Sequence, residues 1–248
     1  MALFCIKMMH PERIFLLRGS HEFAMANYRF GFPLEIKERY DDLESTKALY
    51  GCINVAFSYL SLAAVVGDKY LCVHAGVAAA GMTRKLLRRI PKPYIHTQND
   101  FSAHDMMWSD PAIGLRSTTF NVARGSSLLF GTENMAYALY NMDCIGLFRG
   151  HSMMTDGYDI VGNMCISLFS CSGQHNNKGA IAHIGPTGAV EIKVLEIDQA
   201  RVAWDAELLR CNGGEPDYVD EKTQHQQEPP IDIEIDRETG KTIVLGQQ

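Results

Sequence analysis

Three histidines follow short apolar runs along the chain, each close to a glycine, and they are the first candidates for chemistry. They are His21 after residues 14–17, His74 after residues 70–73 and His151 after residues 145–148. If those runs are neighbouring strands of one sheet, their carboxyl ends meet at one edge and the imidazoles converge. Convergent imidazoles bind metals such as zinc, iron or manganese.

The composition describes a globular chain of one large domain or two small ones. It has 248 residues, of which 46% are hydrophobic and 21% charged, which are ordinary values for a chain with a packed core. The net charge of −6 argues against nucleic acid as a partner. Residues 2–9 are apolar but too short for a signal sequence or a membrane span, so we expect no membrane partner.

Cysteine usage points to a reducing compartment. The seven cysteines are an odd number and include no CxxC pair, which indicates neither a zinc ribbon nor a disulfide framework. We expect reduced, mostly buried thiols in a cytoplasmic or nuclear protein.

Hydrophobic periodicity predicts alternating helices and strands, followed by an all-β region. Helices are predicted at residues 22–40, split near Gly31 and Pro33, and at 44–64, 82–89 and 132–142. Strands are predicted at residues 14–17, 70–73, 145–148, 163–170, 179–184 and 190–197. Residues 95–102 and 112–122 are predicted as loops, and residues 103–111 as an apolar approach to a turn.

The composition changes near the C-terminus. Residues 213–248 are acidic and rich in glutamine and proline, which is typical of a disordered segment. We therefore predict a folded domain over residues 1–212 and a disordered tail over residues 213–248, in which residues 231–236 can still pair as an edge strand.

Six segments in chain order carry a resemblance to a known family. They are Arg18-Gly-Ser-His-Glu22, Val73-His-Ala-Gly-Val77, Trp108-Ser-Asp-Pro111, Ala123-Arg-Gly125, Arg149-Gly-His151 and Leu168-Phe-Ser170. They resemble the motifs RGNHE, HGGL, WSDP, DRG, RAH and the start of LFSAPNY in the phosphoprotein phosphatase family, closest to the protein phosphatase-1 type of serine/threonine phosphatase.

The resemblance implies an α/β fold, the calcineurin-like metallophosphoesterase β-sandwich flanked by helices, here lacking its first strands. It implies hydrolysis of phosphomonoesters by a water held on two divalent metal ions, which are manganese, iron or zinc. The partners it implies are phosphoserine or phosphothreonine proteins, or phosphatase regulatory subunits.

The resemblance also assigns roles to individual residues. His74 and His151 match metal-ligating histidines, Ser20 matches a metal-ligating asparagine, His21 matches the general acid, Arg124 matches an arginine that grips the phosphate, and Asp110 matches an acidic residue beside the site.

Two motifs of the family, GDxHG and GDxVDRG, have no counterpart in the chain, and they would supply the metal-binding aspartates. Two imidazoles and a hydroxyl offer no negative charge to balance two dications, so we expect this chain alone to be inactive. The alternatives are a phosphatase completed by an upstream segment, a pseudophosphatase that serves as a docking module, and a scaffold whose histidines are ordinary hydrogen-bonded residues.

Overall fold

The computed structural model describes residues 2–40, 42–78, 82–94, 101–173 and 176–196, and the short segments 233–235 and 242–244. By contacts the chain divides into two units, Met1–Glu196 and Ile197–Gln248. Within the described ranges, no helix has the length and apolar character that crossing a membrane requires.

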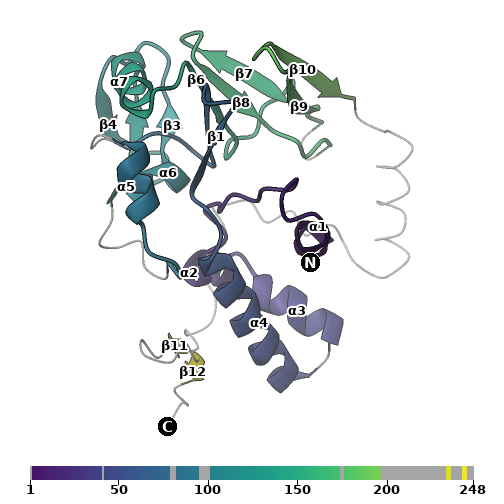
Figure 1. Cartoon of the computed structure of the whole chain (residues 1–248). Coiled ribbons are helices and arrows are strands. Elements are labelled where there is room, and N and C mark those ends of the chain that lie inside the picture. The colour runs from purple at the N-terminus through teal and green to yellow at the C-terminus, as the bar shows by residue number, and fades with distance from the viewer. Residues whose placement is uncertain are drawn as a thin grey trace. The chain divides into compact units, whose positions relative to one another are not determined.

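A mixed five-stranded sheet forms the centre of the first unit (Figure 1). In spatial order its strands are β1 (Ala63–Val66), β2 (Tyr70–Val73), β6 (Gly146–Arg149), β8 (Cys165–Leu168) and β7 (Tyr158–Val161). The middle strands β2, β6 and β8 are parallel, with Leu71 opposite Leu147 and Leu147 opposite Cys165, and all three side chains are fully buried. The carboxyl ends of the parallel strands therefore meet at one edge of the sheet.

Two smaller sheets complete the β structure. One contains β3 (Asp110–Pro111), β5 (Leu128–Phe130) and β4 (Thr118–Phe120), and the other is the hairpin of β9 (Gly179–Ile184) and β10 (Val190–Leu195). The hairpin joins the central sheet beyond β8, because Phe169 accepts a hydrogen bond from Ala180 N and donates one to Gly157 O.

Helices α6 and α7 supply much of the core. In α7 (Thr132–Met142) the buried residues Met135, Ala138, Leu139 and Met142 recur at the spacing of one helical face. In α6 (Phe101–Trp108), Ala103, Met106 and Met107 are completely buried. A further helix, α5 (Arg84–Arg89), begins after Thr83, whose hydroxyl accepts a hydrogen bond from Leu86 N.

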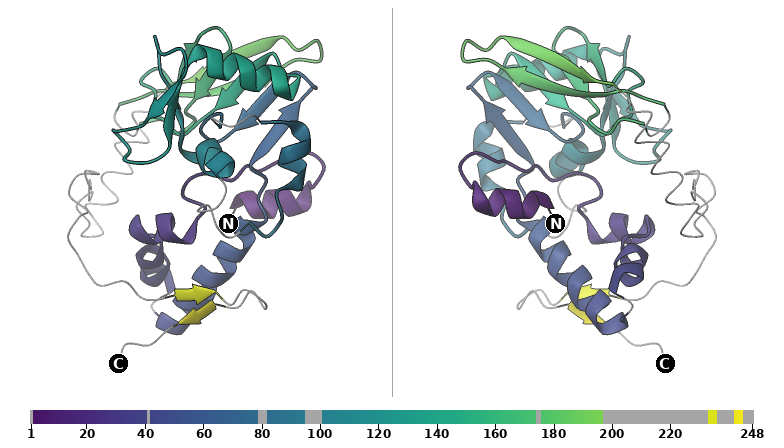
Figure 2. Two further views of the ribbon diagram at one scale, coloured as in Figure 1. Left: turned by 90° about the vertical axis from the view of Figure 1, so that its left-hand side faces the viewer. Right: turned by 90° about the vertical axis from the view of Figure 1, so that its right-hand side faces the viewer.

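The remaining helices come from the first 58 residues (Figure 2). They are α1 (Ala2–Met9), α2 (Ala24–Arg29), α3 (Phe32–Tyr40) and α4 (Leu43–Ser58), and α3 packs on α4. Asp42 caps α4 by accepting a hydrogen bond from Ser45 N. The gap between α2 and α3 confirms the predicted break, since Gly31 has φ +83°.

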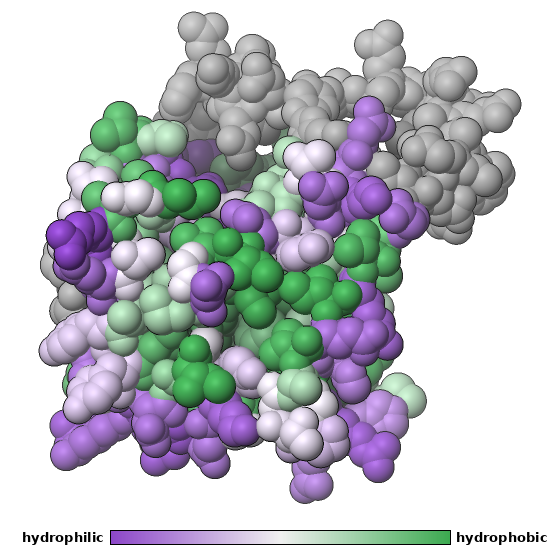
Figure 3. Space-filling model, turned by 90° about the horizontal axis from the view of Figure 1, so that it is seen from above, coloured by the Kyte–Doolittle hydropathy of each residue, from purple (hydrophilic) through white to green (hydrophobic). Residues whose placement is uncertain are grey.

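Apolar side chains also gather on the outer surface, as Figure 3 shows for the face seen from above. The exposed large apolar residues of β7, β9 and β10 are Ile160, Ile181, Val194 and Leu195. Val194 and Leu195 are neighbours in β10 and both are exposed, so side chains on both faces of this end of the strand meet solvent.

Several predicted elements are wrong. Residues 14–17 form no strand but a single parallel bridge between Leu17 and Ser61, because an apolar run becomes a strand only where a partner lies along its whole length. The helix predicted to reach residue 64 ends at Ser58, and Ala63–Val66 form β1 instead.

Residues predicted as irregular also form regular structure. The apolar approach at residues 103–111 lies mostly in α6, and part of the loop at residues 112–122 is β4. In the C-terminal segment, β11 (Ile233–Ile235) lies within the predicted edge strand and pairs with β12 (Thr242–Val244). The rest of the predicted disordered tail, the boundary at residue 212 and residues 95–100 lie outside the described residues.

Candidate active site

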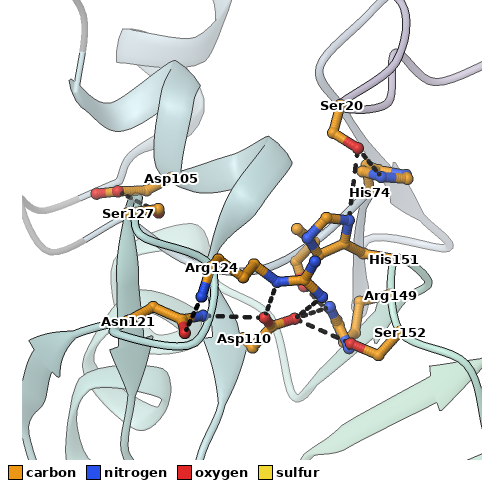
Figure 4. A network of polar contacts seen from close by, with 11 residues as sticks. Ser20, His74, Asp105, Asp110, Asn121, Arg124, Ser127, Arg149, His151 and Ser152 are labelled. Atoms are coloured by element: carbon orange, nitrogen blue, oxygen red, sulfur yellow. Dashed lines mark hydrogen bonds and ion pairs between the residues drawn. The ribbon is translucent and has the colours of Figure 1, made fainter. Parts of the chain in front are cut away.

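Ser20, His74 and His151 meet at the carboxyl edge of the central sheet (Figure 4). His74 directly follows β2 and His151 comes two residues after β6, its parallel neighbour, so their ring centroids lie 5.0 Å apart. The Oγ of Ser20 lies 3.2 Å from His74 Nε2 and 3.5 Å from His151 Nδ1. The structure therefore brings together the three residues predicted as metal ligands, while their role stays a prediction.

The backbone around these residues is tightly constrained. A Cβ on Gly19 would lie 2.6 Å from Glu22 Oε2 and 2.9 Å from the His74 ring, so only glycine fits there. Gly150 N donates a hydrogen bond of 2.8 Å to His74 O, which joins the two strand ends. His151 itself has φ +69°, a left-handed conformation that is strained for a residue other than glycine.

His21, the predicted general acid, stands apart from this cluster. Its side chain is exposed and stacks on Phe30, with ring centroids 4.4 Å apart and an angle of 17° between the planes. A positive charge on His21 would still lower the pKa of His74, so the two rings lie within electrostatic reach. The predicted convergence of three imidazoles is thus confirmed for His74 and His151, whereas His21 makes its ring contact with Phe30.

A charged network centred on Asp110 adjoins the cluster (Figure 4). Asp110 Oδ1 accepts hydrogen bonds from Arg149 Nη2 at 2.8 Å and Ser152 Oγ at 2.9 Å. Its Oδ2 accepts from Asn121 Nδ2 at 3.1 Å and from Arg124 Nε. Burial raises the pKa of Asp110, but the hydrogen bond and charge of Arg124 and the charge of Arg149 outweigh it, so the pKa is lowered overall.

Sequence reasoning missed Arg149 as a member of this network. Its side chain is 0% exposed, whereas that of Arg124 is 28% exposed. A usable signal was present, because an arginine at the end of a buried apolar strand needs an anionic partner nearby. The sequence alone did not say that the partner is Asp110, which is 39 residues away.

Both imidazoles of the cluster are uncharged at neutral pH. Burial, and then the charge of Arg149, lowers the pKa of His74 to about 4. Burial, and then the charge of Arg124, lowers the pKa of His151 to about 3. His151 Nε2 is also buried without a hydrogen-bond partner among the described residues. The cluster is thus a set of neutral nitrogen and oxygen atoms beside two guanidinium groups.

Comparison with known proteins identifies the family. Residues 1–154 match the calcineurin-like phosphoesterase domain. The chain belongs to the calcineurin-like phosphoesterase family. Its α/β class and calcineurin-like fold, both predicted above, are confirmed by this match and by the solved structure described next.

Two similar proteins extend the comparison. The chain is 31% identical over 182 residues to the serine/threonine-protein phosphatase PP1-delta of Caenorhabditis elegans, covering 72% of this chain and 58% of that protein. A solved Saccharomyces cerevisiae protein serine/threonine phosphatase, described as similar to human phosphatase PP5, has a TM-score of 0.70 at 22% identity, covering 79% of this chain and 64% of that one. The chain thus spans less than two thirds of the length of either relative. It is a serine/threonine phosphatase-like domain.

The metallophosphoesterase family implies divalent metal ions, but the described residues do not fit a two-metal centre. The cluster offers two imidazoles and one hydroxyl, and Asp110 is already engaged by two arginines. Across the described part of the chain, no group of three or more histidine, cysteine, aspartate or glutamate side chains is placed to hold a metal ion. Hard dications need anionic oxygen ligands, which these neutral donors do not supply.

Proposed function

We propose that this chain is a serine/threonine phosphatase-type domain that binds phosphorylated serine or threonine side chains of proteins without hydrolysing them. One observation carries the proposal. A partly exposed arginine, Arg124, lies beside a cluster of neutral donors and is held there by Asp110.

The charges around the cluster favour a phosphate. Arg124 is held by Asp110 through Nε, with Nη2 3.4 Å from the other carboxylate oxygen. Figure 4 shows its guanidinium next to the His151 ring, and its charge adds to burial in lowering the pKa of His151. Because Arg149 adds a second positive charge against the single negative charge of Asp110, the local balance is positive. A guanidinium held in this way binds phosphate through charge-assisted hydrogen bonds.

Hydrolysis requires more than binding. Uncatalysed hydrolysis of phosphate monoesters is among the slowest reactions that enzymes accelerate, and family members use metal ions to generate the attacking hydroxide. The described residues hold no such set of ligands. An acid such as His21 therefore has no activated nucleophile to assist, and the chain acts as a pseudophosphatase.

The test compares a phosphoserine peptide with its unphosphorylated form by titration calorimetry. We expect binding only of the phosphorylated peptide, and Arg124→Gln should weaken it by about tenfold to a hundredfold, the usual value of a charged hydrogen bond. Arg116→Gln is the matched control, because Arg116 pairs with Glu133 on the exposed surface. Equal affinity for the two peptides, or no loss with Arg124→Gln, would contradict the proposal.

A second candidate function is metal-dependent phosphatase activity, favoured by the uncharged imidazoles and the unpartnered His151 Nε2. Its ligand set would need carboxylates from outside the described residues. The assay measures bound metal and the turnover of an aryl phosphate with manganese added. Turnover that His21→Ala abolishes would establish this function and overturn binding without hydrolysis.

A further inference from the structure

A hydrogen-bonded pair near the cluster, His104 and Ser126, takes no part in the function proposed so far. His104 lies in α6, and its Nε2 is 2.8 Å from Ser126 Oγ. Ser126 follows Arg124 by two residues, on the same connection that leads into β5. The pair therefore links the connection before β5 to a helix of the core.

The pair is connected to the cluster through one aromatic side chain. His104 stacks on Trp108, with ring centroids 6.2 Å apart and an angle of 22°. Trp108 in turn meets His151 edge to face, with centroids 5.7 Å apart and an angle of 84°. His104, Ser126 and Trp108 are all half-buried, so each presents part of its side chain to solvent. The Trp108 ring separates the His104–Ser126 pair from His151 in the predicted phosphate site. The three side chains together are called the wall below.

This wall is polar but carries no net charge. Burial lowers the pKa of His104, so its imidazole is uncharged at neutral pH. The neighbouring Asp105 accepts a hydrogen bond of 2.8 Å from Ser127 Oγ, and its negative charge disfavours a second carboxylate nearby. A serine hydroxyl has one donor and two acceptor positions, and the bond to His104 uses only one of them. Ser126 can therefore bond a further polar group.

We propose that the His104–Ser126 pair is a specificity subsite that contacts the residue next to the phosphorylated side chain and selects an uncharged hydrogen-bonding residue, such as glutamine or asparagine, over an apolar one. This inference rests on the proposed function, because it needs a phosphorylated side chain beside Arg124. The physical reason is that an apolar neighbour removes water from the pair without replacing its hydrogen bonds, which costs affinity.

The experiment uses pairs of phosphoserine peptides that are identical except for glutamine or leucine at one position. In one pair that position immediately precedes the phosphoserine, and in the other it immediately follows it. We expect the glutamine peptide to bind about tenfold more tightly at one of these positions, the factor expected for one net hydrogen bond. The double variant His104→Phe, Ser126→Ala keeps a ring against Trp108 but removes both polar groups. It should bind the two peptides equally or favour leucine, with unchanged affinity for inorganic phosphate.

Two further variants keep the result interpretable. Ser126→Ala alone removes the hydroxyl with little change in volume, and it should lose most of the preference even if the double variant unfolds. His183→Phe changes an exposed histidine of β9, whose side chain is 63% exposed, and should leave the preference intact.

The outcomes separate this inference from the proposed function. If the unchanged chain binds phosphate and binds the glutamine and leucine peptides equally tightly, the subsite is overturned and the proposed function stands. A glutamine preference that survives Ser126→Ala and the double variant would also overturn it. Failure of phosphate and all the phosphopeptides to bind would overturn both.

Discussion

Two adjoining regions of the site differ in the charge state of their polar groups. The cluster of Ser20, His74 and His151 is buried by losing charge, since both imidazoles are uncharged at neutral pH. The network around Asp110 keeps its charges although Arg149 is completely buried, because each carboxylate oxygen accepts two hydrogen bonds of 3.1 Å or less.

The difference teaches which atoms remain available to a ligand. Arg149 and His151 come from the end of the same strand, two residues apart, yet Arg149 is completely engaged and His151 retains a buried nitrogen without a partner among the described residues. The buried charge of Arg149 is satisfied internally and fixes the geometry, whereas the partly exposed Arg124 and the neutral groups with spare hydrogen-bonding capacity are left to meet a ligand.

The largest effect of a single substitution should come from breaking the charged network. Asp110→Ala leaves the charge of Arg149 buried without an anion and should lower the free energy of unfolding by about 3–5 kcal/mol. Urea denaturation measures this, and Arg116→Ala provides the control, because its exposed pair with Glu133 should contribute no more than about 1 kcal/mol. Similar losses for the two variants would show that the network adds no more than a surface pair.

The pH dependence of stability should separate the two regions. In the unfolded chain both imidazoles titrate near pH 6.5, but in the folded chain only at about 4 for His74 and about 3 for His151. Below pH 6.5 the unfolded state therefore binds more protons. As the pH is lowered from 6.5 to about 4, the free energy of unfolding should therefore decrease. Each imidazole should contribute up to about 1.4 kcal/mol per pH unit to this decrease.

The contribution of Asp110 should respond differently. Its pKa is lowered in the folded chain, so its stabilisation should persist until the pH falls below the usual aspartate range. The test compares the unchanged chain with the double variant His74→Gln, His151→Gln by thermal unfolding between pH 7.5 and 4.5. The double variant should show the shallower slope, and parallel curves would mean that the imidazoles are not the groups that titrate.

A carboxylate placed in the neutral cluster should convert it towards a metal site. Ser20→Asp adds an anionic ligand between His74 and His151 and should tighten zinc binding by about tenfold or more, which a competition assay with a chromophoric chelator measures. Ser20→Asn, which stays uncharged, is the control. Equal zinc affinity in the two variants would show that charge is not what the cluster lacks.

The smallest effect should come from Ser20→Ala. Its hydroxyl makes long contacts of 3.2 and 3.5 Å with rings that are already uncharged, so its loss should lower the free energy of unfolding by about 1 kcal/mol or less. Urea denaturation again provides the measurement. A loss as large as that of Asp110→Ala would remove the distinction between the two regions.

The sequence predicted some elements well because their signals are local. The 3.6-residue spacing of apolar positions gave α7, and Gly31 with Pro33 gave the break between α2 and α3. The same spacing was present at Ala103, Met106 and Met107 and was missed, because the run is short and precedes a proline turn. Residues 14–17 had the composition of a strand but lacked a partner along their length.

What the sequence by itself determined is which side chains follow three apolar runs: a serine and a histidine after residues 14–17 and the turn at Gly19, a histidine after residues 70–73, and Arg-Gly-His after residues 145–148. Only the tertiary structure decided that β2 and β6 are neighbours, that Asp110 is held between Arg124 and Arg149, and that His21 stays exposed. The reason is that strand order, burial and charge pairing depend on contacts between residues far apart in the chain, which no local pattern specifies.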